Sequence, residues 1–138
     1  MAVRRRGRGP DLVLFHGGMG SWRHWIRNID ALAERFTVHA LDHPSYGDSA
    51  PVPRETTGPE YLDLVHAAFL EMFPGAGPLR LAGFSFGAAI ATNLARRLGP
   101  RVTQQELGHV LAVVADRLDD QYKSERSVAL SYVKPRGS

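Results

Sequence analysis

The stretch Leu79-Arg80-Leu81-Ala82-Gly83-Phe84-Ser85-Phe86-Gly87 decides how this chain is expected to fold. Residues 79–82 form a short apolar run typical of a buried strand, and a helix rich in small residues is predicted over residues 87–98. The five residues at the junction fit the pattern G-x-S-x-G. At a sharp strand-to-helix turn, this pattern holds a serine in a strained backbone conformation with its hydroxyl clear of the sheet edge. Ser85 is therefore the predicted nucleophile.

Two further strands and two further helices precede this stretch. Asp11–Phe15 is an apolar run ending in glycines, and Thr37–Leu41 is the next predicted strand. A helical apolar face recurs over residues 25–36, and a second helix is predicted over 58–72, where Thr57 and Glu60 form a capping box. Strands alternating with helices indicate an α/β fold, a three-layer sandwich around a short, mostly parallel sheet.

The loop after the first of these strands reads His16-Gly17-Gly18-Met19-Gly20-Ser21. Acyl transfer needs two backbone N–H donors directed at the developing oxyanion. Phe86, which follows the serine, is predicted to supply one donor. Glycine lets a neighbouring backbone approach closely, so Gly18 or Met19 is predicted to supply the other.

These two motifs, together with the intervening Leu41-Asp42-His43-Pro44-Ser45-Tyr46-Gly47-Asp48-Ser49, resemble the α/β-hydrolase superfamily over residues 11–100. Members commonly carry D-x-P-G-x-G-x-S at this intervening stretch, and Ser45 replaces its first glycine. The resemblance implies a serine nucleophile attacking an ester, amide or related acyl group. It also implies no cofactor or metal, and a loop-ordering role for His16 and Gly17.

The resemblance also implies a partial fold containing the family's third, fourth and fifth strands. The strand at 12–15 should lie between those at 38–42 and 79–82. The helices at 25–35 and 87–98 should share one face, with that at 58–72 on the other. Residues 101–138 show no resemblance, although 127–133 could form an additional strand.

The acid and base of a catalytic triad are not identified. His109 is the only histidine after Ser85, and the acids that follow it are in the reverse of the family order. A helix is predicted over 103–122, with Leu107, Val110, Leu111, Val114 and Leu118 facing the sheet and His109 and Asp116 facing solvent. His43 is an alternative base. The sequence therefore predicts a truncated or rearranged serine hydrolase of weak or no activity.

Two other readings remain as alternatives. The first is a non-enzymatic α/β remnant or interaction module. The second is a dinucleotide-binding domain using Gly18-x-Gly20, in which the third glycine of the fingerprint would fall at Arg23.

Composition limits the remaining classes. The 138 residues predict one domain, and a net charge of +3 without a recognition motif argues against specific nucleic-acid binding. No apolar run is long enough for a membrane helix, and the absence of cysteine fits a cytoplasmic location. Residues 1–10, rich in arginine, are predicted to be a flexible basic tail. Exposed sheet edges predict self-association.

Overall fold

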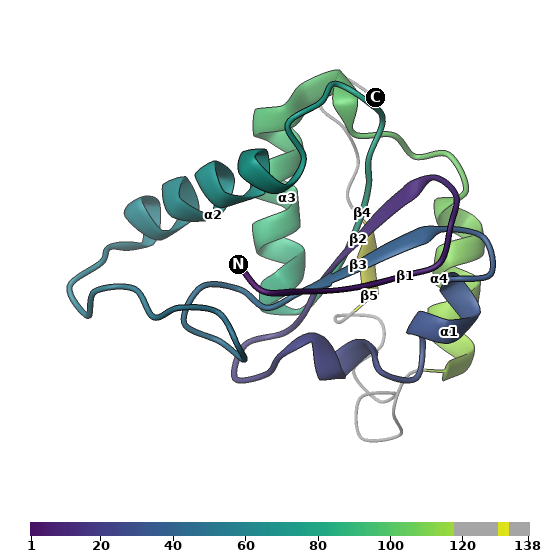
Figure 1. The fold of residues 1–138 in the computed structure, drawn as a ribbon, viewed down its shortest axis with the longest axis horizontal. Coiled ribbons are helices and arrows are strands. Elements are labelled where there is room, and N and C mark those ends of the chain that lie inside the picture. The colour runs from purple at the N-terminus through teal and green to yellow at the C-terminus, as the bar shows by residue number, and fades with distance from the viewer. Residues whose placement is uncertain (118–129, 133–138) are drawn as a thin grey trace.

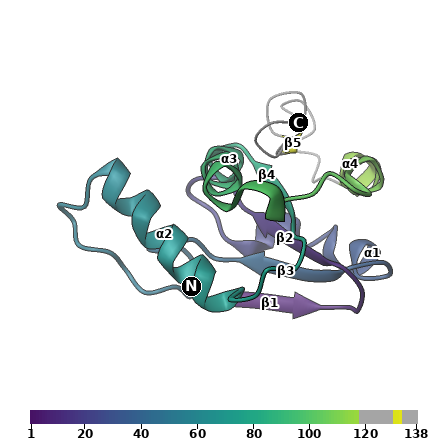
Figure 2. The same ribbon diagram turned by 90° about the horizontal axis from the view of Figure 1, so that it is seen from above.

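The computed structural model describes residues 1–117 and 130–132, which form a sheet between two layers of helices (Figures 1 and 2). The sheet has five strands in the order β1-β3-β2-β4-β5. In chain order the strands are β1 (Val3–Arg6), β2 (Asp11–Phe15), β3 (Thr37–Leu41), β4 (Arg80–Phe84) and β5 (Leu130–Tyr132). The predicted three-layer α/β architecture is confirmed.

The three inner strands are parallel, and β2 lies between β3 and β4 as predicted. Leu12 pairs with Val38 on one side and with Arg80 on the other. The two outer strands, β1 and β5, are antiparallel to their neighbours, so the sheet is mixed. The strand expected near 127–133 is present as β5.

The prediction of a flexible tail over residues 1–10 is wrong, because β1 pairs with β3 in an ordered ladder. Arg5 Nε donates to His39 Nδ1 at 3.0 Å, and the opposite ring nitrogen, Nε2, lies 2.8 Å from a carboxylate oxygen of Asp11. These contacts link side chains of β1, β3 and β2. The sequence signal was misleading since three consecutive arginines show no apolar alternation, yet exposed arginines suit an edge strand.

Helices α2 (Gly58–Met72) and α3 (Phe86–Leu98) cover the same face of the sheet, on a core that includes Phe69 and Ile90. The prediction that the 87–98 helix would share a face with residues 25–35 is therefore wrong. The crossover from β3 to β4 runs across the sheet in the opposite direction to that from β2 to β3. Right-handed crossovers then place the intervening segments on opposite faces, and α3, which follows β4, stays beside α2.

The single helix predicted over residues 25–36 is instead the 3₁₀ turn η1 (Trp22–Trp25) followed by the short helix α1 (Ile29–Leu32). Backbone hydrogen bonds spanning three residues, such as Asn28 N to Trp25 O at 2.8 Å, tighten the segment beyond α-helical geometry. The predicted apolar face is nevertheless buried: Trp25, Ile29, Leu32 and Phe36 all belong to the core.

Helix α4 (Leu107–Arg117) packs on the same face as α1, with Leu107, Val110 and Val114 buried as predicted. Leu111 is half-buried, and Leu118 lies outside the described residues. His109 is half-buried with its ring 6.3 Å from that of Phe36, so the expected solvent-facing position is only partly correct. The side chain of Asp116 is also outside the description. Within residues 1–117, no helix has the length and apolar character needed to cross a bilayer.

Candidate active site

Ser85 lies at the junction between β4 and α3 in a backbone conformation that side chains seldom adopt, with φ 55° and ψ −119°. Its side chain is exposed. Tight packing leaves no alternative to small neighbours. A Cβ on Gly83 would lie 2.6 Å from the Ala88 Cα, and one on Gly87 would overlap the Phe15 carbonyl oxygen. The turn therefore leaves Ser85 exposed at the end of β4, in the strained backbone conformation that the sequence predicted.

The glycine loop approaches this turn from the end of β2. A Cβ placed on Gly18 would lie 3.6 Å from the Phe86 Cβ, so these two backbones are close neighbours. Met19 also has a positive φ of 62°, but its side chain is 96% exposed. The structure thus brings Ser85, Phe86 and Gly18 together. Ser85 also begins the N-terminal end of a 13-residue helix, where partial positive charge favours an anion.

Three histidines hold the glycine loop. His16 is fully buried, with Nδ1 2.7 Å from the Gly17 carbonyl oxygen and Nε2 accepting from the His43 backbone N–H at 3.1 Å. The His43 Nε2 lies 3.0 Å from the His16 carbonyl oxygen, and the His24 Nδ1 accepts from the Gly17 N–H at 3.0 Å. Both nitrogens of His16 are engaged with backbone, so this imidazole supports the loop and does not reach for the serine proton.

Burial keeps this histidine cluster neutral. Desolvation lowers the pKa of His43 to about 3, with the nearby His16 adding to the shift and its hydrogen bond to the His16 backbone opposing it. Burial also lowers the pKa values of His16 and His24. In the described residues the His43 Nδ1 is buried without a hydrogen-bond partner. The alternative role of His43 as a base finds no support, because a ring with a pKa of about 3 is a weak base.

The loop after β3 is organised by Asp42. Its buried carboxylate accepts from the backbone N–H groups of Trp22 at 2.8 Å and Asp48 at 3.0 Å. A Cβ on Gly47 would overlap this carboxylate. Asp42 therefore ties the loop to η1.

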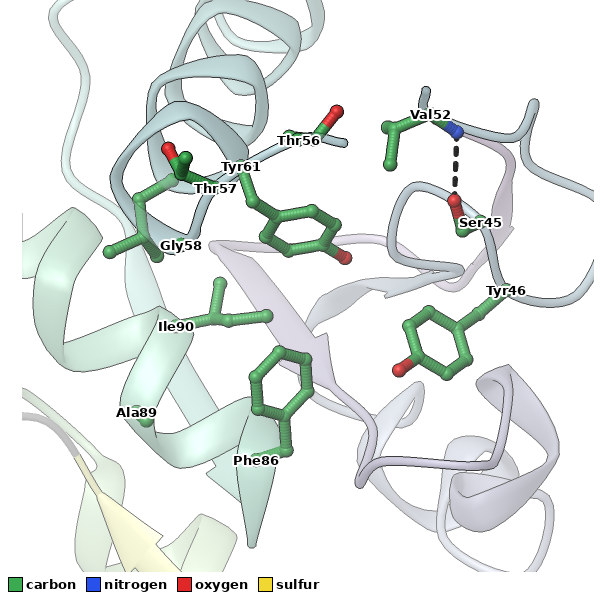
Figure 3. Close-up of a pocket in the computed structure, with 11 residues that line it drawn as sticks. Ser45, Tyr46, Val52, Thr56, Thr57, Gly58, Tyr61, Phe86, Ala89 and Ile90 are labelled. Carbon is green, nitrogen blue, oxygen red and sulfur yellow. Dashed lines mark hydrogen bonds between the residues drawn. The ribbon is translucent and has the colours of Figure 1, made fainter. Parts of the chain in front are cut away.

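An apolar pocket of about 440 Å³ lies beside the elbow (Figure 3). Its walls come from the 45–57 loop, the start of α2 and the start of α3. The ring of Phe86 neighbours those of Tyr46 and Tyr61, with centroids 6.4 and 6.3 Å away. Among the described residues, no three His, Cys, Asp or Glu side chains are placed to hold a metal ion.

A family model described as the alpha/beta hydrolase fold matches residues 10–116. This chain belongs to that family. The match continues past residue 101, where the sequence had predicted that the resemblance ends. The pimeloyl-[acyl-carrier protein] methyl ester esterase of Vibrio campbellii is 34% identical over 98 residues, 71% of this chain and 36% of its own length.

Other relatives are named for different activities. The dihydrolipoyllysine-residue acetyltransferase component of the acetoin cleaving system of Cupriavidus necator is 38% identical over 92 residues, which are 66% of this chain and 24% of that protein. A solved epoxide hydrolase variant from Vigna radiata has a TM-score of 0.61 and 28% identity, covering 72% of this chain and 32% of the neighbour. The alpha/beta hydrolase chain thus spans about a third or less of these proteins.

Ser45 carries strain that the usual family glycine would not. Its φ is 73°, and its Oγ accepts from the Val52 N–H at 2.8 Å. We expect Ser45→Gly to be more stable than Ser45→Ala by about 1 kcal/mol, because both variants lose the hydrogen bond but only glycine relieves the positive φ. Urea unfolding of the two variants measures this difference. Equal stabilities would contradict the strain at this position.

Sequence reasoning missed the loop-supporting roles of His24 and His43 in this alpha/beta hydrolase. His24 lies in η1, and its ring packs so closely against Gly20 that a Cβ there would overlap it. The available signal was only that each histidine flanks a predicted strand end or turn. Their convergence on one loop depends on the pairing of β2 with β3.

Proposed function

We propose that this chain carries the nucleophile and oxyanion donors of a serine ester hydrolase. The supporting observation is the strained, exposed Ser85 at the start of α3, with Gly18 packed against Phe86. In this proposal the Ser85 hydroxyl oxygen attacks the acyl carbon. The backbone N–H groups of Phe86 and Gly18, with Met19 as the alternative to Gly18, stabilise the tetrahedral oxyanion.

The identity of the nucleophile favours esters over the other substrates in the family. A solved neighbour is named an epoxide hydrolase, and another, at 24% identity, a haloalkane dehalogenase. Attack by a serine on an epoxide or alkyl halide would form an ether, which water does not readily cleave. Attack on an ester expels the alcohol and forms an acyl-serine, which water then hydrolyses to the acid while regenerating the hydroxyl.

The rate of acylation is expected to be low in this chain. Both ring nitrogens of His16 are engaged with backbone, and a pKa of about 3 makes His43 a weak base. The serine proton would therefore pass to solvent, with assistance only from the oxyanion donors and the helix N-terminus. In serine proteases that have lost triad members, such contributions leave a residual advantage of roughly 10³–10⁴ over water.

Labelling by a fluorophosphonate tests the proposal directly. The wild-type chain should gain one adduct slowly by intact mass spectrometry, with the adduct on Ser85, and Ser85→Ala should gain none. Thr92→Ala is the matched control, since it removes an exposed hydroxyl of α3 that donates to the Ala88 carbonyl. Absence of labelling at high probe concentration would favour a non-enzymatic module. Rapid labelling would reveal a base outside the described residues.

A further inference from the structure

The pocket beside the elbow is continuous with the proposed reaction centre through a single residue. Phe86 contributes its backbone N–H to the proposed oxyanion site, and its ring, 39% exposed, forms part of the pocket wall. Figure 3 shows this ring facing Ile90 and Tyr61, on the side of α3 that is turned towards α2. A group bound to Ser85 can therefore extend over Phe86 into the pocket without leaving the reaction centre.

The walls of the pocket are uncharged. Among residues 1–117 and 130–132, no Asp, Glu, Lys, Arg or His contributes to the lining, and Val52, Leu62 and Ile90 supply aliphatic surface. The Tyr61 hydroxyl donates to the Pro44 carbonyl at 2.9 Å, and burial raises the pKa of this phenol, which keeps it neutral. A charged substrate group would find no partner here and would lose its hydration.

The hydroxyl groups of the lining are mostly committed elsewhere. Thr57 Oγ1 caps α2, donating to the Glu60 carboxylate at 2.9 Å and accepting from the Glu60 N–H at 3.2 Å. Figure 3 shows the Thr56 and Thr57 oxygens directed away from the space between Tyr61 and Ile90, whereas the Tyr46 hydroxyl points towards Phe86. The interior offers apolar contact with one polar group at its margin.

We propose that this pocket binds the acyl chain of the ester, and that the substrates are esters of uncharged, medium-length apolar acids. This inference rests on the proposed function. The acyl group is assigned to the pocket for two reasons. It contains the carbonyl that is held beside the Phe86 N–H, and it stays attached to Ser85 after the alcohol leaves. The alcohol group would occupy the pocket only until the first bond breaks.

Size and transfer energetics set the expected preference. A volume of about 440 Å³ falls within the range of small-molecule sites. Each methylene that passes from water into an apolar site gains about fourfold in affinity. Only part of a long chain can be enclosed in an open pocket, so we expect an octyl fluorophosphonate to label Ser85 on the order of 100-fold faster than its methyl analogue.

Filling the pocket should abolish that preference. Ala89 is exposed at the pocket wall on α3, one helical turn after Ser85, so the effect of Ala89→Phe is read as a ratio of two rates. The added ring occupies the space and should bring the octyl rate within about threefold of the methyl rate. Ala112→Phe makes the same exchange at an exposed position of α4, on the other face of the sheet, and should keep the octyl preference.

A binding measurement separates failure of the pocket from failure of the enzyme. In Ser85→Ala, 2-decanone should shift the NMR methyl signals of Ala89 and Ile90 saturably and leave the Ala112 methyl signal unchanged. Saturable shifts without labelling of the wild type would keep the pocket assignment and reject the proposed function. Labelling without a chain-length preference would overturn the acyl-chain assignment. Hydrolysis of alkyl acetates at a rate that rises with the length of the alcohol would also overturn it.

Discussion

Gly87→Ala is expected to destabilise the chain by about 3–5 kcal/mol, enough to unfold most molecules of an ordinary domain. The added Cβ would overlap the Phe15 and His16 carbonyl oxygens at the end of β2. Phe15 is held by its pairing in the sheet, and the His16 carbonyl oxygen lies 3.0 Å from His43 Nε2. Both atoms belong to backbone, so the clash cannot be relieved by rotating a side chain. Urea unfolding followed by circular dichroism measures the loss.

Gly108→Ala provides the matched control for this exchange. Gly108 lies within α4, and a Cβ there would have nothing within 4 Å. The same added methyl group should stabilise the chain by about 0.5–1 kcal/mol, because alanine restricts the unfolded backbone and favours helix. A Gly87→Ala chain as stable as the wild type would show that α3 does not pack on β2 as described.

Acidification is expected to weaken the fold through the buried histidines. The pKa of His43 in the folded chain is about 3, against 6.5 for an unperturbed histidine. Between these values the unfolded chain binds one more proton than the folded chain. His43 therefore contributes stability that is complete above about pH 6.5 and falls by about 1.4 kcal/mol per pH unit as the pH is lowered towards 3.

His43→Gln isolates this contribution. The glutamine amide can still donate towards the His16 carbonyl, but it does not titrate. The variant should be less stable at pH 7.5, since the ring stacked 5.9 Å from Phe15 is lost, yet its free energy of unfolding should fall less steeply with acid. Urea unfolding at pH 7.5, 6.0, 5.0 and 4.5 gives both slopes. Parallel slopes would mean that His43 is not buried as a neutral group.

Local sequence was sufficient for the inner strands and for the elbow. Continuous apolar runs identify β2, β3 and β4, and the glycines around Ser85 report a turn that admits no side chain at Gly83 or Gly87. These features are encoded within a few residues of one another. The G-x-S-x-G pattern therefore located the proposed nucleophile, which remains a proposal until labelled.

Features that depend on pairing between distant segments could not be predicted in the same way. The arginines of β1 carry no strand pattern of their own. Arg4 and Arg5 gain their partners, Asp48 and His39, only when β3 and its following loop are in place. The pocket likewise needs α2 and α3 on one face, which depends on the direction of the β3-to-β4 crossover. Self-association through sheet edges stays a prediction, and the charged β1 edge opposes it.

The central position of β2 has a consequence for the time course of folding. β2 is made early in the chain, but its two neighbours come later, and Leu12 completes its pairing only when Arg80 arrives. Contacts so distant in sequence form slowly, because the entropy cost of closing a long loop comes before the contacts can stabilise the chain. Until β4 docks, one side of an almost entirely apolar strand has unpaired N–H and C=O groups. That interval exposes the chain to misassembly during synthesis or refolding.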